Sequence, residues 1–405
     1  MNAASAIRYD FIAPRRIVFG WGRRREVGAL GKTLGSRALI IHGSRTLAER
    51  GVVAEITDLL AAEGVHAANV ASISHEPEVD DVDRVTAMLR SETATSLLGE
   101  RPVGRGDFVL ALGGGAAIDL AKAVAAMATN DQSPTVKDYL EGVGRGLKLV
   151  SEPLPVLAMP TTAGTGCEAT KNAVISSYDP PFKKSLRDDR IMPQIALVDP
   201  ELTVSLPPKI TAASGMDAIT QLFESYISLK AQPIPQALAV EGLRLAIPSI
   251  AQAVGDGSSR EAREKMAHAA LLSGLCLGNS GLGMAHGVTP ALGVHCRVPH
   301  GAACALMLPV ALRVNARVRR AELARLAHLL FGQGPSTKPD KAVEVLIAEV
   351  EKLCDAVGAP RRLSDLGVSG EMIPAIVASS RGSSMSGNPR ELSDEELTQI
   401  LDEIL

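Results

Sequence analysis

A carboxylate, an amide and two imidazoles in the second half of the chain have side chains that could bind a metal ion. Asp217 and Gln221 are spaced i,i+4 in GMDAITQ, so both would project from one face of a helix. His286 and His300 follow in MAHGVTPALGVHCRVPHG. One carboxylate oxygen and two imidazole nitrogens suit Fe²⁺ or Zn²⁺, and Gln221 could add a neutral carbonyl oxygen. Three protein ligands would leave a position open for a substrate oxygen.

Each of the three strongest donors also has an ordinary structural explanation. Asp217 could cap or hydrogen-bond near the start of its helix, and His286 could be a core histidine whose hydrogen bonds are satisfied. His300 lies between Pro299 and Gly301, so it could belong to a turn. The metal hypothesis therefore depends on whether the fold brings the donors together.

A glycine loop earlier in the chain could hold a phosphate. Gly113, Gly114 and Gly115 follow the apolar run DFVLAL and precede a helix-like segment that contains Asp119. Without a Cβ, the backbone can approach a phosphate closely, and the first N–H groups of the helix would face the anion. A tight strand-to-helix turn that binds nothing would have the same sequence.

A second loop, PTTAGTGCE, also follows an apolar run, LPVLAM. Thr161, Thr162 and Thr165 offer hydroxyl groups there, although a polar loop of ordinary turns is the simpler interpretation. Two such loops after two parallel strands are much harder to explain by chance. Together they predict a dinucleotide across the carboxyl ends of the strands.

Short apolar runs alternate with helical patterns in the first half of the chain. We expect strands at 37–42, 107–112, 154–159 and 195–198, with helices at 52–64 and 117–128 between them. Long Ala- and Leu-rich helical segments follow at 212–228, 235–255, 259–277 and 317–331, and SDEE at 393–396 is a capping box. These patterns predict an α/β dinucleotide-binding domain with a parallel sheet (residues 1–205), followed by an all-α metal and substrate domain (residues 206–405).

Composition excludes several classes of partner. The net charge of −3 and the aromatic content of 3% argue against a nucleic-acid partner. No uninterrupted apolar stretch is long enough to span a membrane, and the N-terminus does not resemble a signal peptide. The five cysteines form no CxxC pair, which is typical of reduced thiols in a cytoplasmic protein.

Eight motifs in order make the chain resemble the iron-containing (group III) alcohol dehydrogenase family over nearly its whole length. They are RRIVFGWG, GGGAAIDLAKA, PTTAGTGCEAT, ALVDPELT, GMDAITQLFESYIS, GLGMAHG, VPHGAACALMLP and SSMSGNPRELSDEEL. The resemblance implies an active site between the two domains and a homodimer. It also implies that the glycine and threonine loops contact the cofactor, and that the metal ligands include Asp217, His286 and His300. The family lysine near the nicotinamide ribose falls on Lys183, with Lys184 as the alternative.

Three positions depart from the family pattern. The fourth family ligand is usually histidine, and here it is Gln221, whose amide oxygen is a weaker ligand. A second cleft histidine, often assigned to proton relay, is replaced by Pro290, which cannot carry a proton. The family serine after the glycines is Ala116, which removes one hydroxyl contact to phosphate.

The segment after the first predicted strand bears on cofactor choice. NAD-preferring members often carry an aspartate there, whereas this chain has His42, Gly43, Ser44 and Arg45. Gly43 and Ser44 are predicted cofactor contacts. Ser44 and Arg45 could bind a 2′-phosphate, although Arg45 could equally be a solvated surface residue. We expect NADP(H), with NAD(H) as the alternative.

The sequence therefore predicts metal-dependent hydride transfer between a nicotinamide cofactor and a small alcohol or aldehyde. Asp217, His286, His300 and Lys183 are the predicted catalytic residues, and Fe²⁺ or Zn²⁺ the predicted metal. Two alternatives remain at this stage. One is a dehydroquinate-synthase-like lyase that uses NAD transiently, and the other is a non-catalytic nucleotide-binding protein.

Overall fold

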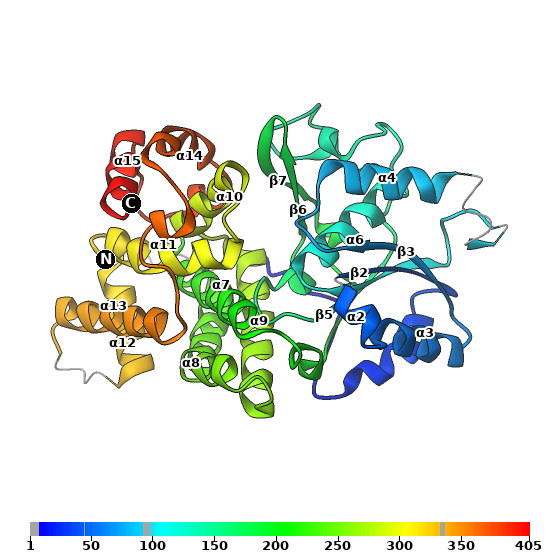
Figure 1. Ribbon diagram of the computed structural model, residues 1–405, viewed down its shortest axis with the longest axis horizontal. Coiled ribbons are helices and arrows are strands. Elements are labelled where there is room, and N and C mark those ends of the chain that lie inside the picture. Colours follow the sequence, from blue (N-terminus) through cyan, green and yellow to red (C-terminus); the bar gives the residue numbers. More distant parts are fainter. Residues whose placement is uncertain (1–7, 44, 92–97, 100, 333–336) are drawn as a thin grey trace.

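The chain forms an α/β part and a helical part that lie side by side (Figure 1). The computed structural model describes residues 8–43, 45–91, 98–99, 101–332 and 337–405. The predicted fold class, a parallel α/β region followed by an all-α region, is confirmed. The last strand of the main sheet ends at Val198 and the first long helix begins at Pro208. The division into two domains after residue 205 stays a prediction.

Six parallel strands form the main sheet in the order β1-β8-β5-β4-β2-β3. The predicted strands are found as β2, β4, β5 and β8, whereas spacing does not identify β1 and β3. Those two form the edges of the sheet and bury fewer of their residues, so they lack a continuous apolar run. The bounds are β1 Arg16–Phe19, β2 Arg37–Gly43, β3 His66–Ile73, β4 Asp107–Gly113, β5 Val156–Pro160 and β8 Ile195–Val198.

Helices cover both faces of this sheet, because successive residues of its central strands point to opposite faces. Leu39 and Ile41 of β2 belong to one core cluster, and Ile40 belongs to another. The first face is covered by α4 (Val79–Arg90) and α6 (Gly115–Met127), and the second by α1 (Val27–Lys32) and α3 (Val52–Ala62). The short helix α2 (Arg45–Glu49) follows β2.

An antiparallel hairpin, which the sequence pattern does not identify, extends the α/β part toward the helical part. It consists of β6 (Asn172–Tyr178) and β7 (Pro181–Arg187), and it pairs Ser176 with Lys183. The hairpin packs against α6 and against α10 (Met284–Cys296) of the helical part. It therefore carries Lys183 to the boundary between the two parts.

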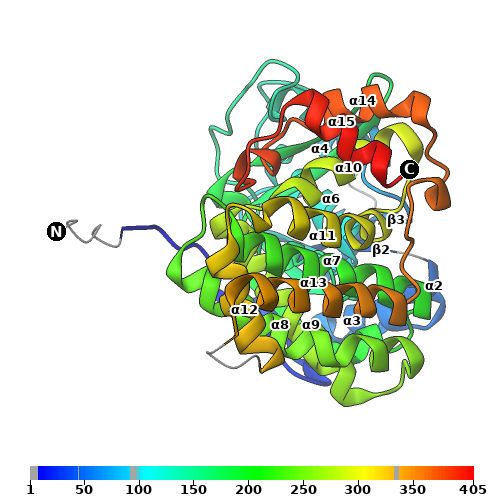
Figure 2. The same cartoon turned by 90° about the vertical axis from the view of Figure 1, so that its left-hand side faces the viewer.

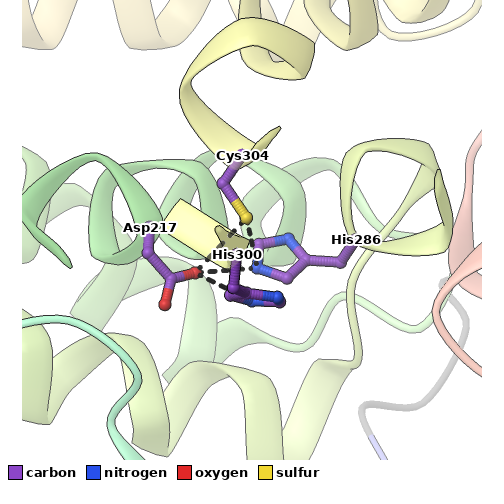
Figure 3. Close-up of side chains that lie close together, drawn as sticks. All are labelled: Asp217, His286, His300 and Cys304. Atoms are coloured by element: carbon purple, nitrogen blue, oxygen red, sulfur yellow. Dashed lines mark hydrogen bonds and ion pairs between the residues drawn. The ribbon is translucent and has the colours of Figure 1, made fainter. Parts of the chain in front are cut away.

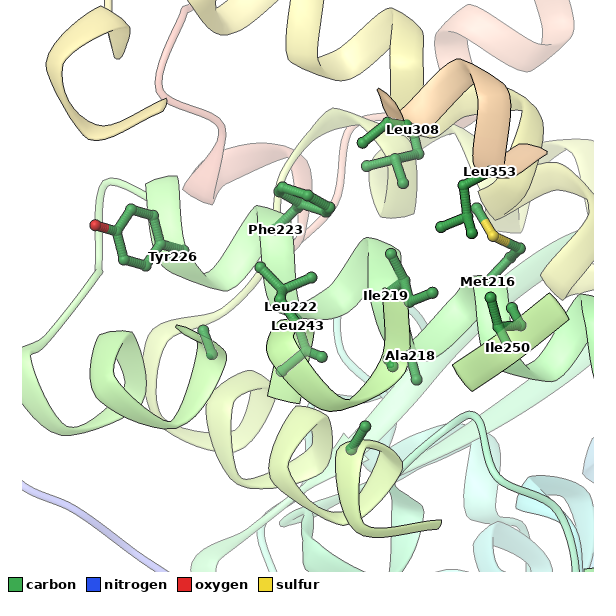
Figure 4. Packing of buried hydrophobic residues seen from close by; sticks show 14 of the residues in the cluster. Met216, Ala218, Ile219, Leu222, Phe223, Tyr226, Leu243, Ile250, Leu308 and Leu353 are labelled. Carbon is green, nitrogen blue, oxygen red and sulfur yellow. The ribbon is translucent and has the colours of Figure 1, made fainter. Parts of the chain in front are cut away.

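The helical part is built around α7, whose apolar side chains meet those of α8, α11 and α13 (Figure 4). In Figure 2, which looks onto this part, α12 and α13 lie on its outer side. The predicted helices correspond to α7, α8, α9 and α12, and the capping box begins α15, with Ser393 as N-cap. The bounds are α7 Pro208–Ile227, α8 Pro233–Gly255, α9 Arg260–Ser280, α10 Met284–Cys296, α11 His300–Ala316, α12 Arg320–Phe331, α13 Pro339–Ala356, α14 Ile373–Ser379 and α15 Asp394–Glu403.

Helix α8 is long and apolar enough to cross a membrane, judged by length and composition alone. In the structure it packs against α7 and α9. Leu243, Ala246 and Ile250 of α8 are completely buried in the core of the helical part. Packing between helices therefore accounts for part of its apolar character, since 39% of its most apolar stretch is buried.

Candidate active site

Three helices bring the predicted metal donors to one point. Helix α7 carries Asp217 and Gln221 on one face, with Glu224 a further turn along. His286 lies in the first turn of α10, and α11 begins at His300. Asp217 and His286 are buried, whereas the His300 side chain is 27% exposed.

A fourth donor, Cys304, joins this cluster (Figure 3). Oδ1 of Asp217 lies 3.0 Å from Nε2 of His286 and 3.6 Å from Nε2 of His300. Sγ of Cys304 lies 3.5 Å from the same carboxylate oxygen and 3.5 Å from Nε2 of His286. All four ligand atoms lie within 4.8 Å of one another, which is close enough to share one ion.

Glu224 fixes the orientation of His286. Its carboxylate is 2.7 Å from Nδ1 of His286, and it also accepts hydrogen bonds from the backbone N–H groups of Ala285 and His286. With a proton on Nδ1, the lone pair of Nε2 is free to bind a metal. A carboxylate behind a histidine in this way is the usual outer partner of metal-binding imidazoles.

The electrostatics of the cluster also favour a cation. Burial alone would raise the pKa of Asp217, but the charges and hydrogen bonds of His300 and His286 hold that pKa well below its usual range. Burial would lower the pKa of His300, but Cys304 and Asp217 raise it to about 9. Anionic donors thus stabilise positive charge at this point. The donor set, one carboxylate, two imidazoles and a thiol, therefore fits a divalent metal.

Gln221 lies beside the cluster and holds its carboxylate. Its Nε2 donates to Oδ1 of Asp217 at 3.0 Å and faces the backbone oxygen of Thr165 at 3.4 Å. Its Oε1 accepts from Oγ of Ser273 at 2.8 Å, on the side away from Asp217. In this arrangement the amide orients Asp217, and metal ligation by Gln221 stays a prediction.

The two predicted cofactor loops touch each other where β4 and β5 end. The N–H of Thr161 donates to the carbonyl oxygen of Gly113 at 3.0 Å. A Cβ on Gly115 would lie 2.8 Å from Cγ2 of Thr165, and one on Gly114 would lie 3.2 Å from Cγ2 of Thr162. Because α6 begins at Gly115, its first N–H groups have no partner within the helix, and Gly115 lies against Thr165 of the second loop. The arrangement fits the pyrophosphate of a dinucleotide.

The other predicted cofactor contacts differ in how closely they approach the two loops. Gly43, at the end of β2, lies directly against Gly113. Ser44 lies outside the described residues, and Arg45 is exposed at the start of α2. Asp119 lies 3.1 Å from Nζ of the fully buried Lys122 and accepts a hydrogen bond from the backbone of Val174. It therefore joins α6 to β6, while its contact with the cofactor stays a prediction.

Lys183 reaches the same region from β7. Its Nζ lies 2.6 Å from Oε1 of Glu76, and its side chain is 9% exposed. Burial would raise the pKa of Glu76, but the charge of Lys183 lowers it. The pair lines the same cavity as Thr165 and His300, where the reacting end of the cofactor is expected.

One cavity is lined by residues of both cofactor loops, of the hairpin and of the metal cluster. It has a volume of about 890 Å³ and lies between the two parts of the chain. Its lining includes Gly115 and Thr165 from the cofactor loops, Lys183 from the hairpin, and Asp217 and His300 from the metal cluster. Pro290 also lines it. The metal cluster and the two loops thus open into one space of the size typical of ligand pockets.

Comparison with known proteins agrees with this architecture. The family profile described as "Iron-containing alcohol dehydrogenase" matches residues 14–200, and "Fe-containing alcohol dehydrogenase family, C-terminal" matches residues 211–405. Long-chain-alcohol dehydrogenase 1 of Geobacillus thermodenitrificans (strain NG80-2) is 33% identical over 362 residues, which cover 87% of each chain. The chain belongs to the iron-containing alcohol dehydrogenase family.

Two further relatives align with nearly the whole length of this iron-containing alcohol dehydrogenase. The NAD-dependent methanol dehydrogenase of Bacillus methanolicus is 29% identical over 394 residues, which are 97% of this chain and 98% of that protein. A crystal structure of 1,3-propanediol oxidoreductase superposes with a TM-score of 0.88 at 29% identity, covering 98% of this chain and 100% of the other. The predicted family and the predicted class of enzyme, an alcohol dehydrogenase acting on CH–OH, are confirmed. The lyase and non-catalytic alternatives find no support.

Three residues of this iron-containing alcohol dehydrogenase join the site without having been predicted from the sequence. Cys304 is spaced i,i+4 from His300, and Glu224 is spaced i,i+7 from Asp217, so helical periodicity could have indicated both. Glu76 follows β3, far from the other site residues in sequence. Nothing in its local pattern indicates that it pairs with Lys183.

Proposed function

We propose that this iron-containing alcohol dehydrogenase interconverts a small alcohol and its aldehyde by hydride transfer to and from NADP(H). The observation that carries the proposal is the shared cavity, which joins the metal cluster to the two cofactor loops. A small substrate bound at the metal would therefore lie next to the reacting end of the cofactor.

Each residue of the site would have a separate role in this reaction. Asp217, His286 and His300 would hold Fe²⁺ or Zn²⁺, which acts as a Lewis acid on the substrate oxygen when bound. Glu224 holds His286 so that its Nε2 faces Asp217 and would bind the ion. Lys183 would donate a hydrogen bond to the nicotinamide ribose while Glu76 restrains its ammonium group. Pro290 lines the cavity without a titratable group, so proton exit would use the ribose and Lys183, or water.

The preference for NADP(H) is supported by the end of β2. In the part of the chain that the structure describes, no carboxylate follows Gly43 closely, and Arg45 is exposed without an ion pair. An arginine at this place can bind a 2′-phosphate through charge-assisted hydrogen bonds. The methanol dehydrogenase relative is NAD-dependent by name, so NAD(H) is the competing cofactor. The ratio of kcat/KM for NADPH and NADH decides between them, and Arg45→Ala should lower only the value for NADPH.

Assembly and location complete the proposal. Strand β1 is an edge of the sheet, and its Ile17 is 38% exposed, so it offers a surface for a second copy. We propose a homodimer, which light scattering of the purified protein would test. All five cysteines are unpaired, in agreement with a reducing cytoplasmic location.

The decisive experiment removes one donor. The His300→Ala variant should lose bound metal and turnover of aldehydes with NADPH, while its affinity for NADPH stays nearly unchanged. His66→Ala, an exposed histidine on β3, is the matched control and should behave like the wild type. Turnover that survives in His300→Ala would contradict the metal mechanism. Inactivity of the wild type with added Fe²⁺ or Zn²⁺ across a broad aldehyde panel would contradict the function itself.

A further inference from the structure

Cys304 occupies a position from which it could complete the metal centre. It lies one helical turn after His300 on α11, so both side chains leave the same face of the helix. The residue is fully buried, and Figure 3 shows its sulfur directed at the point where the other donors meet. Among the residues that the structure describes, only Thr289 competes for the sulfur from outside the cluster, through a weak contact of its Oγ1 at 3.7 Å.

The distances match those of a tetrahedral ion with one sulfur ligand. Bonds of about 2.3 Å to sulfur and about 2.0–2.1 Å to nitrogen and oxygen would place S···N and S···O pairs about 3.6 Å apart and N···O pairs about 3.3 Å apart. The sulfur of Cys304 is 3.5 Å from its nitrogen neighbour on His286 and 3.5 Å from its oxygen neighbour on Asp217. The two N···O distances are 3.0 and 3.6 Å.

The cluster also has a closed side and an open side. Asp217, His286 and His300 line the cavity, whereas Cys304 does not. Cys304 would therefore hold the ion from the protein interior and leave the cavity side free. A substrate oxygen could approach the ion from the cavity side.

Gln221 is the other candidate for the fourth corner, and its contacts argue against it. Its Nε2 faces two acceptors, the carboxylate of Asp217 and the backbone oxygen of Thr165. Turning the amide to offer its oxygen to a metal would place that oxygen against the Thr165 carbonyl. The chain thus uses Gln221 to position Asp217 and has a different donor available for the ion.

We propose that Cys304 is the fourth protein ligand of the metal in this chain, and that the site selects Zn²⁺ over Fe²⁺. This inference deepens the proposed function and rests on its metal site. Metal binding releases the thiol proton to water and leaves a thiolate, so Asp217 and Cys304 together balance the two charges of the ion. Thiolate is the softest donor of the set, and mixed sulfur and nitrogen sites are typical of zinc.

Cobalt substitution tests the ligand directly. The wild type loaded with Co²⁺ should show a thiolate-to-cobalt charge-transfer band in the near ultraviolet. Cys304→Ser should lose the band, and its zinc affinity should fall by at least about a hundredfold, since even outer partners of metal ligands contribute 10–100-fold. The matched control is Cys276→Ser, which removes an equally buried thiol from α9 and should keep the band. Thermal unfolding of the metal-free variants reports separately whether each one folds.

Gln221 provides the second arm. Gln221→Ala should keep the band, whereas the double variant Gln221→His with Cys304→Ser should regain cobalt binding through a new imidazole without the band. X-ray absorption of the zinc-loaded wild type should show one sulfur at about 2.3 Å. A competition between equal Zn²⁺ and Fe²⁺ under anaerobic conditions should end with zinc in the wild type.

Three results would overturn the proposal. They are stoichiometric cobalt without a band in the wild type, a band that persists in Cys304→Ser, and absence of metal binding altogether. Iron retained in the competition would refute the selectivity. The proposed function fails separately, because a metal centre with a sulfur ligand but no turnover of any alcohol or aldehyde would leave the ligand assignment intact.

Discussion

Glu224 lies 2.7 Å from Nδ1 of His286 and binds the backbone N–H of that same residue. A single carboxylate thus holds both the ring and the first turn of α10, and the free Nε2 faces Asp217 at 3.0 Å. Asp217 and Glu224 come from the same helix. Helix α7 would therefore supply one carboxylate to the ion, from Asp217, and a second carboxylate, from Glu224, that holds the ligand His286.

Replacing this outer carboxylate should weaken the metal site without removing a ligand. Glu224→Gln should lower the affinity for Zn²⁺ by about 10–100-fold, since the amide can still accept a hydrogen bond but no longer stabilises the imidazole by charge. Chelator competition measures the change. Glu241→Gln, on an exposed position of α8, is the control. Equal zinc affinity in both variants would show that Glu224 has no part in metal binding.

Gly43 and Gly113 are in contact, so replacing each glycine by alanine gives a matched pair of variants. A Cβ on Gly113 would meet the backbone nitrogen of Gly43 at 2.8 Å and Cβ of Ala117 at 2.7 Å, whereas a Cβ on Gly43 would meet nothing nearer than 3.4 Å. Gly113→Ala should therefore cost about 1–3 kcal/mol of folding free energy and weaken cofactor binding. Gly43→Ala should change stability much less. Urea unfolding and cofactor titration measure both, and similar losses in the two variants would contradict the packing argument.

The sequence identifies the centre of the fold better than its edges. β2, β4, β5 and β8 are buried on both faces and therefore form apolar runs, which the edge strand β3, largely exposed or half-buried, does not. Helical spacing does not identify α10 and α11, because each contains an internal proline, Pro290 and Pro309, which ordinarily interrupts a helix. In both helices tertiary packing outweighs this local cost.

The same limit applies to the site. Residue type makes Asp217, His286 and His300 candidates, and the family resemblance supports them as a set, although each one alone also has an ordinary structural explanation. A buried cysteine is usually an ordinary core residue, so Cys304 becomes a candidate only when its distance to His286 is known. For Gln221 the sequence suggests more than the structure does. Its position in the sequence indicates a metal ligand, whereas its hydrogen bond to Asp217 indicates a residue that orients this carboxylate.

Lys183 and Lys184 both line the cavity, and replacing each separately will show which one serves the cofactor. Lys183→Met should lower kcat/KM for the cofactor by about ten- to a hundredfold, the effect of losing one hydrogen bond from a charged group. Lys184→Met should have little effect, because only Lys183 is held in place by Glu76. Steady-state kinetics measure both variants, and a larger loss in Lys184→Met would reverse the assignment.

A further variant separates two causes of such a loss. Removing Lys183 also leaves the carboxylate of Glu76 unpaired. If that unpaired charge is the cause, the double variant Lys183→Met with Glu76→Gln should recover activity. If the lysine contacts the cofactor, as expected, the double variant should stay impaired.

Glu168, in the threonine loop, should make stability depend on pH. Burial raises the pKa of Glu168 to about 7, so the folded protein favours the protonated form. The stabilisation of the folded state by protonated Glu168 is complete below the unfolded pKa of about 4.3. It is lost as the pH rises from there through about 7. Glu168→Gln, which cannot ionise, should therefore match the wild type at pH 4.5 and exceed its free energy of unfolding by about 3 kcal/mol at pH 8.

Urea unfolding of metal-free protein between pH 4.5 and pH 8 measures this difference. Glu371→Gln replaces an exposed glutamate and should follow the wild type at every pH. A constant difference between Glu168→Gln and the wild type across this range would show that the carboxyl group does not titrate there. A difference in the free energy of unfolding that grows between about pH 5 and pH 7 and then stays level would assign the pH dependence to Glu168. Any other titrating group is present in both proteins, so its contribution cancels in the comparison.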